Sequence, residues 1–458
     1  MKVAVMGTGH VGLVTCVTFG EIGHDVVGTD IDVEKIEQLG RGIPPFFEPG
    51  LEESMHRTTE AGRLRFDADP ASALRDAEVV FVCVGTPARA NGDANLLAVE
   101  HAASQIARHG RDGAVVVEKS TVPAGTADRV RVTLQRDGGG RTFDVASNPE
   151  FLREGSAMKD ALEPDRIVIG IESAHALDVL RRLYAPLLSA GAPLIVTDIR
   201  TAELAKHASN AFLSLKISFA NALAQICERA GADVTAVADV MGSDPRIGRA
   251  FLNAGLGYGG YCFPKDVAAL HRLADRLGYP FPLLREVERL NAEAVDSAVA
   301  KVEDALWNLE GKRIAVLGLS FKPGTDDVRF SPALNLVTRL LAAGADVVGF
   351  DPHAARAAKD ELPGLELASS AYEAARDAHA LVIATEWPEF AQLDLAELRA
   401  TMAYPLVVDG RNLLDPTEMA EAGFWYYPTG RPSVAPAVTD GDGLTRDDVA
   451  TLGRTAPR

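Results

Sequence analysis

Two patterns of apolar positions alternate along the first 200 residues. The stretch 11–23 has the apolar content of a buried helix, and short apolar runs lie on both sides of it. Runs of this strand length recur at residues 2–7, 25–30, 77–85, 113–121 and 143–151. Polar or helical stretches separate them, which predicts a mainly parallel sheet covered by helices. We predict that this first domain ends near residue 200.

The strand pattern disappears after residue 200 and long helical patterns replace it. The first of these runs from residue 201 to Gly231 and the second from residue 283 to Gly311. The second repeats apolar residues at spacings of three to five, which predicts one buried helical face. Those positions are Leu283, Val287, Leu290, Val295, Val299, Val302 and Leu306. Two interpretations remain open: a simple core helix, or a connecting helix that also supplies a dimer surface.

Alternation of strands and helices returns at residue 312. A strand, a polar loop, a helix and a strand span residues 312–352, and two further apolar runs lie at 379–387 and 405–412. The predicted fold class is therefore α/β, with two Rossmann-like parallel-sheet domains, 1–200 and 312–430, joined by a helical middle, 201–311, with a long connecting helix. Residues 431–458 are rich in Pro, Gly and Asp, which predicts a disordered tail.

Composition narrows the classes of partner. The chain has 458 residues and a formal net charge of −18, which argues against nucleic acid or an anionic membrane surface as a partner. No uninterrupted apolar stretch reaches the length of a membrane helix, and glycines break the apolar run at the start of the chain, unlike a signal peptide. We expect a cytoplasmic protein that binds anionic ligands in a pocket.

The four cysteines are too few for a disulfide scaffold, and their spacing predicts no metal site. Three of them lie in apolar stretches, where a thiol acts as a small buried hydrophobe. Cys262 instead lies in GLGYGGYCFPKD, residues 255–266. The glycines suit a backbone that closely approaches a ligand, and Pro264 can start a helix. A thiol at a helix N-terminus is biased toward the thiolate, so we expect Cys262 to be a nucleophile.

A glycine fingerprint follows the first predicted strand. Gly7, Gly9 and Gly12 form GTGHVG, and Asp30 ends the next strand 18 residues after the last of these glycines. Such glycines let the backbone reach a pyrophosphate at a helix N-terminus, and the acidic side chain hydrogen-bonds a ribose 2′-hydroxyl. Because a carboxylate repels a 2′-phosphate, the pattern predicts NAD in preference to NADP.

Three further groups of polar residues are candidates for chemistry. Glu150 and Glu154 are four residues apart, and so are Lys206 and Asn210, so each pair shares a face if its segment is helical. An ammonium and an amide on one face can stabilise a reacting oxygen. A polar loop at 318–329 holds cationic side chains, Lys322 and Arg329, that can meet phosphates. Ordinary solvated surface charge is the alternative for each group.

The motifs together resemble a known family. GTGHVGL, FFEPGLEE, VGTP, KSTVPAGT, NPEFLREG, ELAKHASNAF, GYGGYCFPKD and FKPGTDDVR occur in the order found in the UDP-glucose/GDP-mannose dehydrogenases, and the resemblance runs from Lys2 to about residue 425. It implies an NAD-binding domain, a helical dimerisation domain and a C-terminal domain that binds the nucleotide part of a UDP-sugar. It also implies two successive oxidations at C6 of the sugar, with two NAD and one water, and a homodimer or higher homo-oligomer.

The resemblance implies a role for individual residues. Cys262 would capture the aldehyde, Lys206 and Asn210 would stabilise the C6 oxygen, Asp266 and Thr121 would handle water and protons, and Glu150 would assist thioester hydrolysis. The implied NAD contacts are Gly7, Gly9, Val11, Gly12, Asp30, Lys35, Thr86, Thr121, Glu154, Lys265 and Arg329. The implied substrate contacts are Glu150, Phe151, Leu152, Arg153, Glu154, Lys206, Asn210, Phe251, Leu252, Asn253, Ala254, Gly255, Gly259, Lys322 and, from a partner subunit, Arg246.

Two positions depart from the family pattern, and several functions stay open. His10 stands where the family often has Tyr, and Tyr261 stands where Ser is common before the cysteine. CFPKD resembles the UDP-glucose branch, whose product is UDP-glucuronate, a precursor in polysaccharide biosynthesis. The alternatives are the same reaction on GDP-mannose or UDP-N-acetylmannosamine, a two-electron β-hydroxyacid or 6-phosphogluconate type of dehydrogenase, and a catalytically silent NAD-binding regulator.

Overall fold

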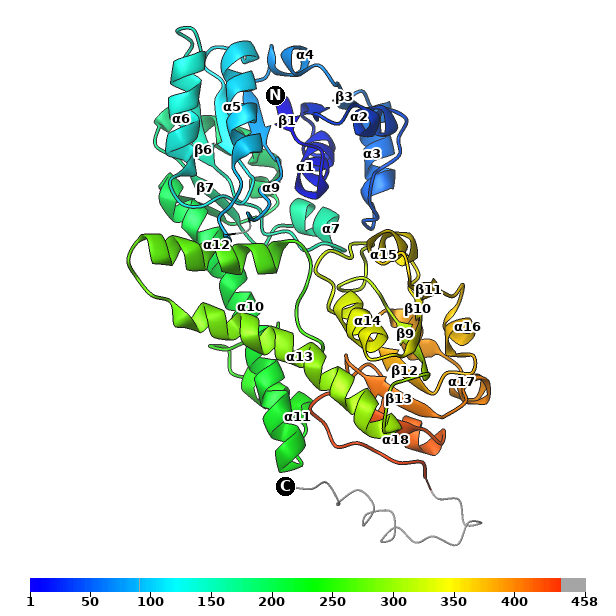
Figure 1. Ribbon diagram of the computed structural model, residues 1–458. Coiled ribbons are helices and arrows are strands. Elements are labelled where there is room, and N and C mark those ends of the chain that lie inside the picture. Colours follow the sequence, from blue (N-terminus) through cyan, green and yellow to red (C-terminus); the bar gives the residue numbers. More distant parts are fainter. Residues whose placement is uncertain (90, 438–458) are drawn as a thin grey trace, which may run out of the picture. The chain divides into compact units, whose positions relative to one another are not determined.

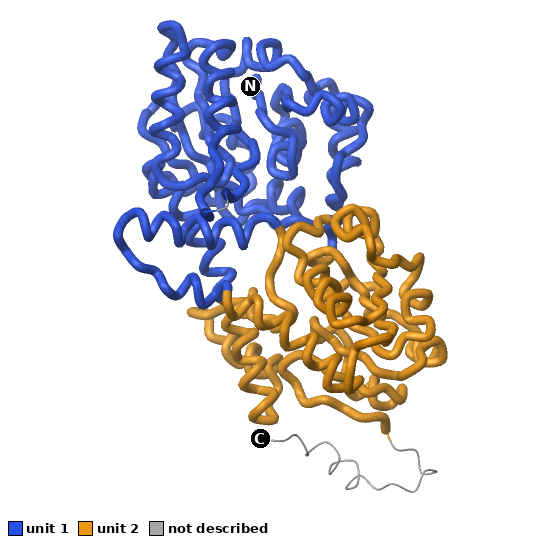
Figure 2. The backbone as a smooth tube through the Cα atoms, in the orientation of Figure 1, with its two compact units in different colours: residues 1–215, 261–288, 324–326 blue, residues 216–260, 289–323, 327–458 orange. Residues whose placement is uncertain are grey.

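The computed structural model describes residues 1–89 and 91–437 and divides the chain into two compact units (Figures 1 and 2). The first unit comprises residues 1–215, 261–288 and 324–326. The second comprises residues 216–260, 289–323 and 327 onward. Both units are therefore built from segments that are discontinuous in sequence. The predicted division into three successive domains describes the order of elements along the chain and remains a prediction.

The first unit is built on an eight-stranded sheet in the order β3-β2-β1-β4-β5-β6-β7-β8. The strands are β1 (Lys2–Met6), β2 (Asp25–Thr29), β3 (Leu64–Phe66), β4 (Val79–Val82), β5 (Val115–Glu118), β6 (Asp144–Ser147), β7 (Ile167–Gly170) and β8 (Leu194–Thr197). The first six strands are parallel and have the order of a dinucleotide-binding fold. The predicted α/β class is confirmed for this unit.

Helices cover both faces of this sheet. One face packs its apolar side chains against α1 (His10–Glu21), α2 (Val33–Gly40), α3 (Leu51–Glu60), α7 (Ala157–Leu162), α8 (Ala174–Leu183) and α9 (Ala185–Ser189). The other face packs against α4 (Pro70–Leu74), α5 (Leu97–His109) and α6 (Thr126–Asp137). Strands buried on both faces read as continuous apolar runs, which is why the sequence shows them clearly.

One junction of the sheet is antiparallel. β6 and β7 pair through a single residue pair, Ser147 with Gly170, and these are the last residues of the two strands. β7 and β8 therefore approach the carboxyl edge of β6 from the opposite direction. Since β8 ends at Thr197, the helix α10 (Ile199–Ala230) begins close to that edge. Gly170 packs so closely that a Cβ there would lie 2.7 Å from the Cα of Ile199.

The second unit contains a six-stranded parallel sheet in the order β11-β10-β9-β12-β13-β14. Its strands are β9 (Arg313–Leu317), β10 (Asp346–Phe350), β11 (Glu366–Leu367), β12 (Ala380–Ile383), β13 (Leu406–Asp409) and β14 (Trp425–Pro428). Its helices are α14 (Pro332–Ala342), α15 (Ala355–Glu361), α16 (Ala371–Ala375), η1 (Pro388–Gln392), α17 (Leu395–Thr401) and α18 (Pro416–Glu421). The order repeats that of the first six strands of the other sheet, which confirms the second predicted α/β sheet.

The helical middle contains α10, α11 (Val234–Gly242), α12 (Cys262–Arg276) and α13 (Pro282–Leu306). Val287, Val295 and Val302 of α13 are buried, as predicted. Leu283 is not part of this buried face: it is 45% exposed, and its neighbour Leu284 is buried instead. The prediction that Leu283 belongs to the buried face is wrong. In the first turn of α13 it is the neighbouring Leu284 that packs into the core.

The described part of the predicted tail makes ordered contacts. Arg431 donates a hydrogen bond to Asp233, and Val434 forms an isolated bridge with Tyr426. The rest of the predicted tail, residues 438–458, lies outside the described residues. In the part of the chain that the structure describes, no helix is long and apolar enough to cross a membrane.

Candidate active site

The glycine fingerprint lies between β1 and α1. Gly7 has φ +93°, and a Cβ there would lie 2.5 Å from the carbonyl oxygen of Cys83. At Gly12 a Cβ would lie 1.8 Å from the Gly7 oxygen, so both positions require glycine. Gly9, the N-cap of α1, has open space in the direction of its missing side chain. The two tight glycines thus shape the turn, while Gly9 leaves the helix N-terminus accessible to an anion.

Asp30 is held at the carboxyl end of β2. Its Oδ2 accepts hydrogen bonds from the backbone N–H and hydroxyl of Thr8 and lies 3.0 Å from the Nζ of Lys35. Burial raises the pKa of this carboxyl, but bonds from Thr8, Asp32 and Lys35 outweigh it and lower the pKa overall. Asp30 is therefore a carboxylate at neutral pH, as hydrogen bonding to a ribose diol requires. Val11 lies in the first turn of α1, next to this site.

His10 connects the fingerprint to two other motifs. Its ring stacks on Phe46 with centroids 4.3 Å apart, and its Nε2 lies 3.1 Å from Oε2 of Glu48. Glu48 is buried and also accepts hydrogen bonds from the backbone N–H groups of Gly155 and Ala157. The departure from Tyr at position 10 thus supplies a nitrogen that binds Glu48. No role for Glu48 was predicted from the sequence, where this acid follows two aromatic residues and precedes Pro-Gly.

A buried ion pair joins the segment after β6 to α10. The Nζ of Lys206 lies 2.8 Å from Oε1 of Glu150, and the two side chains are only 4% and 5% exposed. Oε2 of Glu150 accepts the backbone N–H of Leu152. Burial lowers the pKa of Lys206, but Glu150, Cys262 and Asp266 more than offset this and raise it. Lys206 is therefore a fixed cation, suited to stabilise a negative oxygen rather than to remove a proton.

Asp266 forms the second charged centre of the site. Its Oδ1 lies 2.6 Å from the Nζ of Lys265, and its Oδ2 accepts a hydrogen bond from Asn210 at 2.6 Å. Burial raises the pKa of Asp266, but Lys265, His207 and Lys206 lower it overall, so the group is ionised. Lys265, for which sequence analysis expects an NAD contact, is buried beside Asp266, and its ammonium also lies 5.7 Å from the ring centroid of Tyr261.

Cys262 begins α12, which confirms its expected place at a helix N-terminus. The expected bias toward the thiolate is wrong for this structure. The pKa of the Cys262 thiol is raised to about 12, first by burial and then by the charge of Glu150, while Lys206 acts to lower it. Glu154 and Asp266 also raise it, so the charged groups of the site act directly on this sulfur. Desolvation by the surrounding protein outweighs the helix N-terminus, and the resting thiol is protonated.

The segment after β5 is fixed by α10. The hydroxyl of Thr86 donates to the carbonyl oxygen of Thr121, which brings together two residues with expected cofactor roles. The carboxylate of Glu203 accepts hydrogen bonds from the backbone N–H groups of Gly125 and Ala127 at the start of α6. His207, one turn further along α10, contacts the carbonyl oxygen of Val122 at 2.9 Å. Glu203 and His207 therefore hold residues 122–127, which directly follow Thr121.

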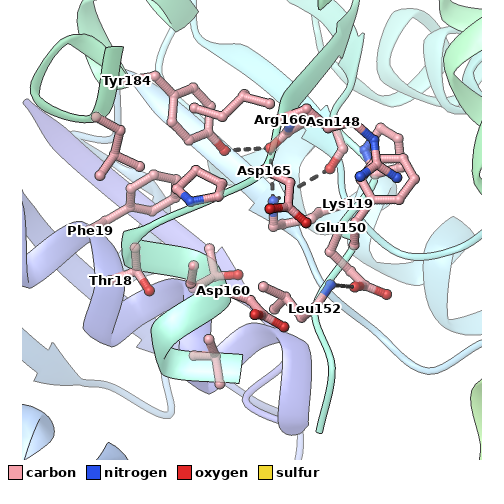
Figure 3. Close-up of a pocket in the computed structure, with 18 residues that line it drawn as sticks. Thr18, Phe19, Lys119, Asn148, Glu150, Leu152, Asp160, Asp165, Arg166 and Tyr184 are labelled. Atoms are coloured by element: carbon pink, nitrogen blue, oxygen red, sulfur yellow. Dashed lines mark hydrogen bonds between the residues drawn. The ribbon is translucent and has the colours of Figure 1, made fainter. Parts of the chain in front are cut away.

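A cavity of about 80 Å³ with both apolar and polar side chains in its lining lies beside Glu150 (Figure 3). Its lining comes from α1, the segments around β6 and β7, and Tyr184. The Nζ of Lys119 lies 2.8 Å from Oδ1 of Asn148, which also accepts the hydroxyl of Tyr184. Burial lowers the pKa of Lys119. The cavity exceeds the volume that one water molecule needs, and the polar side chains of its lining can satisfy such a molecule.

The remaining predicted substrate residues fall into two groups. Arg153 and Glu154 follow Glu150, and Arg153 forms an ion pair with Asp160; Phe151 packs its ring near Lys206. The second unit holds the rest, namely Arg246, Phe251, Leu252, Asn253, Ala254, Gly255, Gly259 and Lys322, and also the predicted cofactor residue Arg329. The side chain of Arg246 is 87% exposed and pairs with Asp244.

The glycines before Cys262 have a different neighbour from the one expected. A Cβ on Gly259 would lie 2.3 Å from the carbonyl oxygen of Phe330, and one on Gly255 would lie 2.7 Å from that of Gly410. Gly257 and Gly260 have positive φ angles. Gly255 and Gly259 therefore allow close packing against the protein's own backbone within the second unit. They give no separate support for the expected close approach of a ligand.

Sequence analysis considered only two residues of a larger polar stripe on α10. Glu203, Lys206, His207, Asn210 and Ser214 follow spacings of three and four and are all buried. A stripe of polar residues at this period on an otherwise apolar helix is a detectable signal for a functional face. Glu118, the last residue of β5, and Lys119, which follows it, gave no such signal, because their surroundings depend on which strands lie next to β5.

A dinucleotide fingerprint, an ionised acid at the end of the second strand, and a buried lysine and carboxylate that act on the thiol of Cys262 define an NAD-dependent dehydrogenase. Models of three successive family domains match this chain: the NAD binding domain at residues 1–188, the central domain at 200–293 and the UDP binding domain at 315–416. The chain belongs to the UDP-glucose/GDP-mannose dehydrogenase family, and its cofactor is NAD. The resemblance inferred from the motifs is confirmed.

Individual relatives match over nearly the whole chain. The UDP-glucose 6-dehydrogenase YwqF of Bacillus subtilis is 45% identical, with 95% of this chain and 99% of the relative covered. The UDP-glucose 6-dehydrogenase of Rhizobium meliloti is 46% identical, with 94% and 100% covered. The solved UDP-glucose dehydrogenase of Pyrobaculum islandicum has a TM-score of 0.88 and 40% identity, with 94% and 98% covered.

The charges around Cys262 predict how its alkylation responds to substitution. Because Glu150 raises the thiol pKa, Glu150→Gln should increase the rate of iodoacetamide alkylation at pH 8 by roughly tenfold. Lys206→Met should decrease it, since Lys206 lowers that pKa. In the unsubstituted protein the rate should still rise between pH 8 and 10. Peptide mass spectrometry measures the rate at Cys262 alone, and equal effects of both substitutions in the same direction would contradict this electrostatic arrangement.

The fixed carboxylate of Asp30 predicts the cofactor preference. Asp30→Asn should weaken the binding of NAD and relieve the repulsion of the 2′-phosphate of NADP. The selectivity for NAD should therefore fall by roughly tenfold or more, which corresponds to the free energy that a hydrogen bond to a charged group contributes. Dissociation constants for both dinucleotides, from protein fluorescence titration, measure this. Asp32→Asn is the matched control, because Asp32 caps α2. Unchanged selectivity in Asp30→Asn would show that this carboxylate does not face the ribose.

Proposed function

We propose that the chain oxidises UDP-glucose to UDP-glucuronate in two NAD-dependent steps, through a thiohemiacetal and a thioester on Cys262. The observation that carries the proposal is the position of Cys262 at the start of α12, four residues before the buried Asp266, where the Lys206–Glu150 ion pair acts on its thiol. A dehydrogenase that stopped at an aldehyde would have no use for this thiol, whereas oxidation to an acid uses a nucleophile to retain the aldehyde.

The first unit has a site that fits NAD. Gly7, Gly9 and Gly12 provide the turn and the open helix N-terminus, and Asp30 provides the carboxylate for the ribose. We assign Val11, Lys35, Thr86, Thr121, Glu154 and Lys265 of this unit, and Arg329 of the second unit, as further contacts. When bound, NAD accepts the hydride that each oxidation removes from C6. The chain's own residues have to manage the protons and the negative oxygen.

Two groups of the site serve the first oxidation. The ammonium of Lys206 and the side-chain amide of Asn210 stabilise the C6 oxygen as its proton leaves. Asp266 is ionised and accepts this proton through a water molecule beside Thr121. Since Lys206 keeps its own proton, it contributes charge throughout the step.

A protonated thiol suits the addition step. When Sγ of Cys262 bonds to the aldehyde carbon, the thiol proton has to move to the former carbonyl oxygen, so a neutral thiohemiacetal forms without net charge. Lys206 assists because a nearby cation favours the sulfur anion during transfer. The second oxidation then removes the hydroxyl proton and a hydride and leaves a thioester.

Hydrolysis of the thioester requires an activated water. Glu150 is held by Lys206 and the backbone of Leu152, and it also lines the cavity that exceeds the volume of one water. We therefore assign Glu150 to the water that cleaves the C–S bond. The attacking water loses a proton, and the leaving sulfur regains one, so that Cys262 returns to its resting state.

We assign UDP-glucose as the substrate, in preference to GDP-mannose or UDP-N-acetylmannosamine. The UDP binding domain of the family and the names of the relatives support this assignment. We assign Phe251 to Gly255, Gly259 and Lys322, with Phe151 to Glu154, as further substrate contacts. The location that we propose is the cytoplasm, where nucleotide sugars are made.

We further propose that the active unit is a homodimer or a higher homo-oligomer. α10 exposes Phe212, Phe219 and Ile226, which are seven residues apart and therefore lie on one helical face. Exposed large apolar side chains in such a row are typical of an interface. The exposed guanidinium of Arg246 suits a contact with the partner subunit's substrate.

The covalent mechanism predicts a trapped intermediate in Glu150→Gln. This variant should transfer both hydrides but release product roughly 10²- to 10⁴-fold more slowly, the usual worth of general-base assistance. Acid-quenched mixtures with UDP-glucose and NAD should show a UDP-glucuronyl adduct on the peptide that contains Cys262, with a burst approaching two NADH per site. The unsubstituted enzyme should form two NADH per UDP-glucose consumed, whereas a two-electron dehydrogenase forms one and a silent regulator forms none.

Cys262→Ala is the control and should give neither adduct nor sustained turnover. Slow turnover of Glu150→Gln without an adduct, under a quench that preserves thioesters, would exclude Glu150 from the hydrolytic step. An adduct on Cys16, Cys83 or Cys227 would show that the nucleophile is wrongly assigned.

A shared site predicts complementation between subunits. Arg246→Ala and Cys262→Ala chains should each be nearly inactive alone, but hybrids should recover activity, because one of the two sites then has both residues intact. Differently tagged chains allow the hybrids to be purified before assay. Hybrids that form but stay as inactive as the parents would contradict a contribution of Arg246 across the interface.

A further inference from the structure

His207 is a buried histidine with one unused ring nitrogen. It lies on α10 next to Lys206, and its side chain is 2% exposed. Its Nε2 lies 2.9 Å from the carbonyl oxygen of Val122, and since a carbonyl only accepts, this nitrogen carries the proton. The Nδ1 is buried without a hydrogen-bond partner among the described residues. It lies 3.9 Å from Oδ1 of Asp266.

This arrangement places two acceptors opposite one another. A bare Nδ1 and an ionised carboxylate oxygen cannot bond, and burying an unsatisfied acceptor costs free energy. One added proton would convert the pair into an N–H donor and a carboxylate acceptor. Nδ1 of His207 can therefore bind a proton, and the proposed reaction releases a proton that Asp266 accepts.

Burial, more than the charges of the neighbouring elements, keeps Nδ1 of His207 unprotonated at rest. On α12, Asp266 raises the pKa of His207 and Lys265 lowers it; on α10, Lys206 lowers it. Burial is the largest cause and lowers the pKa, and the net shift is downward from 6.5. The carbonyl of Val122 faces the other ring nitrogen. His207 is therefore neutral at pH 7 and available to receive a proton.

We propose that His207 is a positioning residue of the oxidation, which shares with Asp266 the proton that leaves the C6 hydroxyl. The inference rests on the proposed function. The O–H bond breaks and its electron pair forms C=O, while the C6–H bond breaks and its hydride would be taken up by NAD. The proton passes through water and Asp266 and forms the Nδ1–H bond of His207. The resulting imidazolium keeps its Nε2–H bond to Val122. The proton returns to solvent before the next turnover.

The substitution His207→Gln separates this role from a structural one. The amide N–H of Gln can still donate to the oxygen of Val122, but its carbonyl oxygen cannot take up a proton at neutral pH. We expect kcat to fall by roughly 10- to 100-fold, somewhat less than the loss of a complete general base, with the KM for NAD and the thermal midpoint retained. The exposed His101→Gln is the matched control and should behave as the unsubstituted enzyme.

The pH profile provides a readout that a structural role would not change. Neutral His207 accepts the proton, so activity should be present above its pKa and lost as the pH falls through it, on a limb below pH 6.5. In His207→Gln this limb should disappear or move. An unchanged kcat and limb in an enzyme that forms two NADH per UDP-glucose would overturn this inference alone, whereas failure of the unsubstituted enzyme to oxidise UDP-glucose would overturn the proposed function.

Nuclear magnetic resonance of ¹⁵N-labelled histidines tests the geometry without activity. The His207 signal is identified as the one that the unsubstituted protein shows and His207→Gln lacks. At pH 7 it should report a neutral ring with the proton on Nε2. In Asp266→Asn the same signal should titrate at lower pH, because the charge of Asp266 raises the pKa of His207. A proton on Nδ1 at pH 7, or no change in Asp266→Asn, would overturn the inference.

Discussion

The ion pair between Lys206 and Glu150 is the constraint on which the site depends. Two charges at 2.8 Å with almost no exposure to solvent are stable only as a pair, and removing one partner of such a pair typically costs about 3–5 kcal/mol. The segment after β6 and the helix α10 are thereby fixed to each other. The ammonium of Lys206 that neutralises Glu150 also lowers the pKa of the Cys262 thiol. One side chain therefore both stabilises the site and affects the reactivity of the thiol.

The architecture of the first unit brings these two segments together. The carboxyl ends of β6 and β7 meet at one edge of the sheet, through the pair of Ser147 with Gly170. Because β7 and β8 approach from the other side and meet β6 at one residue pair, α10 starts near that edge. Its stripe of Glu203, Lys206, His207 and Asn210 then faces the ends of the strands where a dinucleotide fold binds its ligands.

Much of this could be predicted from sequence, for physical reasons. Strands buried on both faces are continuous apolar runs, so β1, β4, β5 and β12 were evident, and the fingerprint glycines are required by steric contact. The short strands β3 and β11, and the strands β7 and β8 beyond the antiparallel junction, were not predicted. Whether such segments form strands depends on the strands that they pair with, which the local sequence does not show. The protonation state of Cys262 was predicted wrongly, since a local helix N-terminus is visible in sequence but desolvation by distant segments is not.

The first unit is discontinuous in sequence, and this affects how the chain is synthesised. Residues 1–215 contain the whole eight-stranded sheet, but Cys262, Lys265 and Asp266 join that unit only after residues 216–260 have been added to the other. During translation from the N-terminus, the dinucleotide fold can therefore form before the thiol leaves the ribosome. A nascent chain of this kind can hold Lys206 and Glu150 in place while Cys262 and Asp266 are still absent, so this ion pair can form at least fifty residues of synthesis, residues 216–266, before the site is chemically complete.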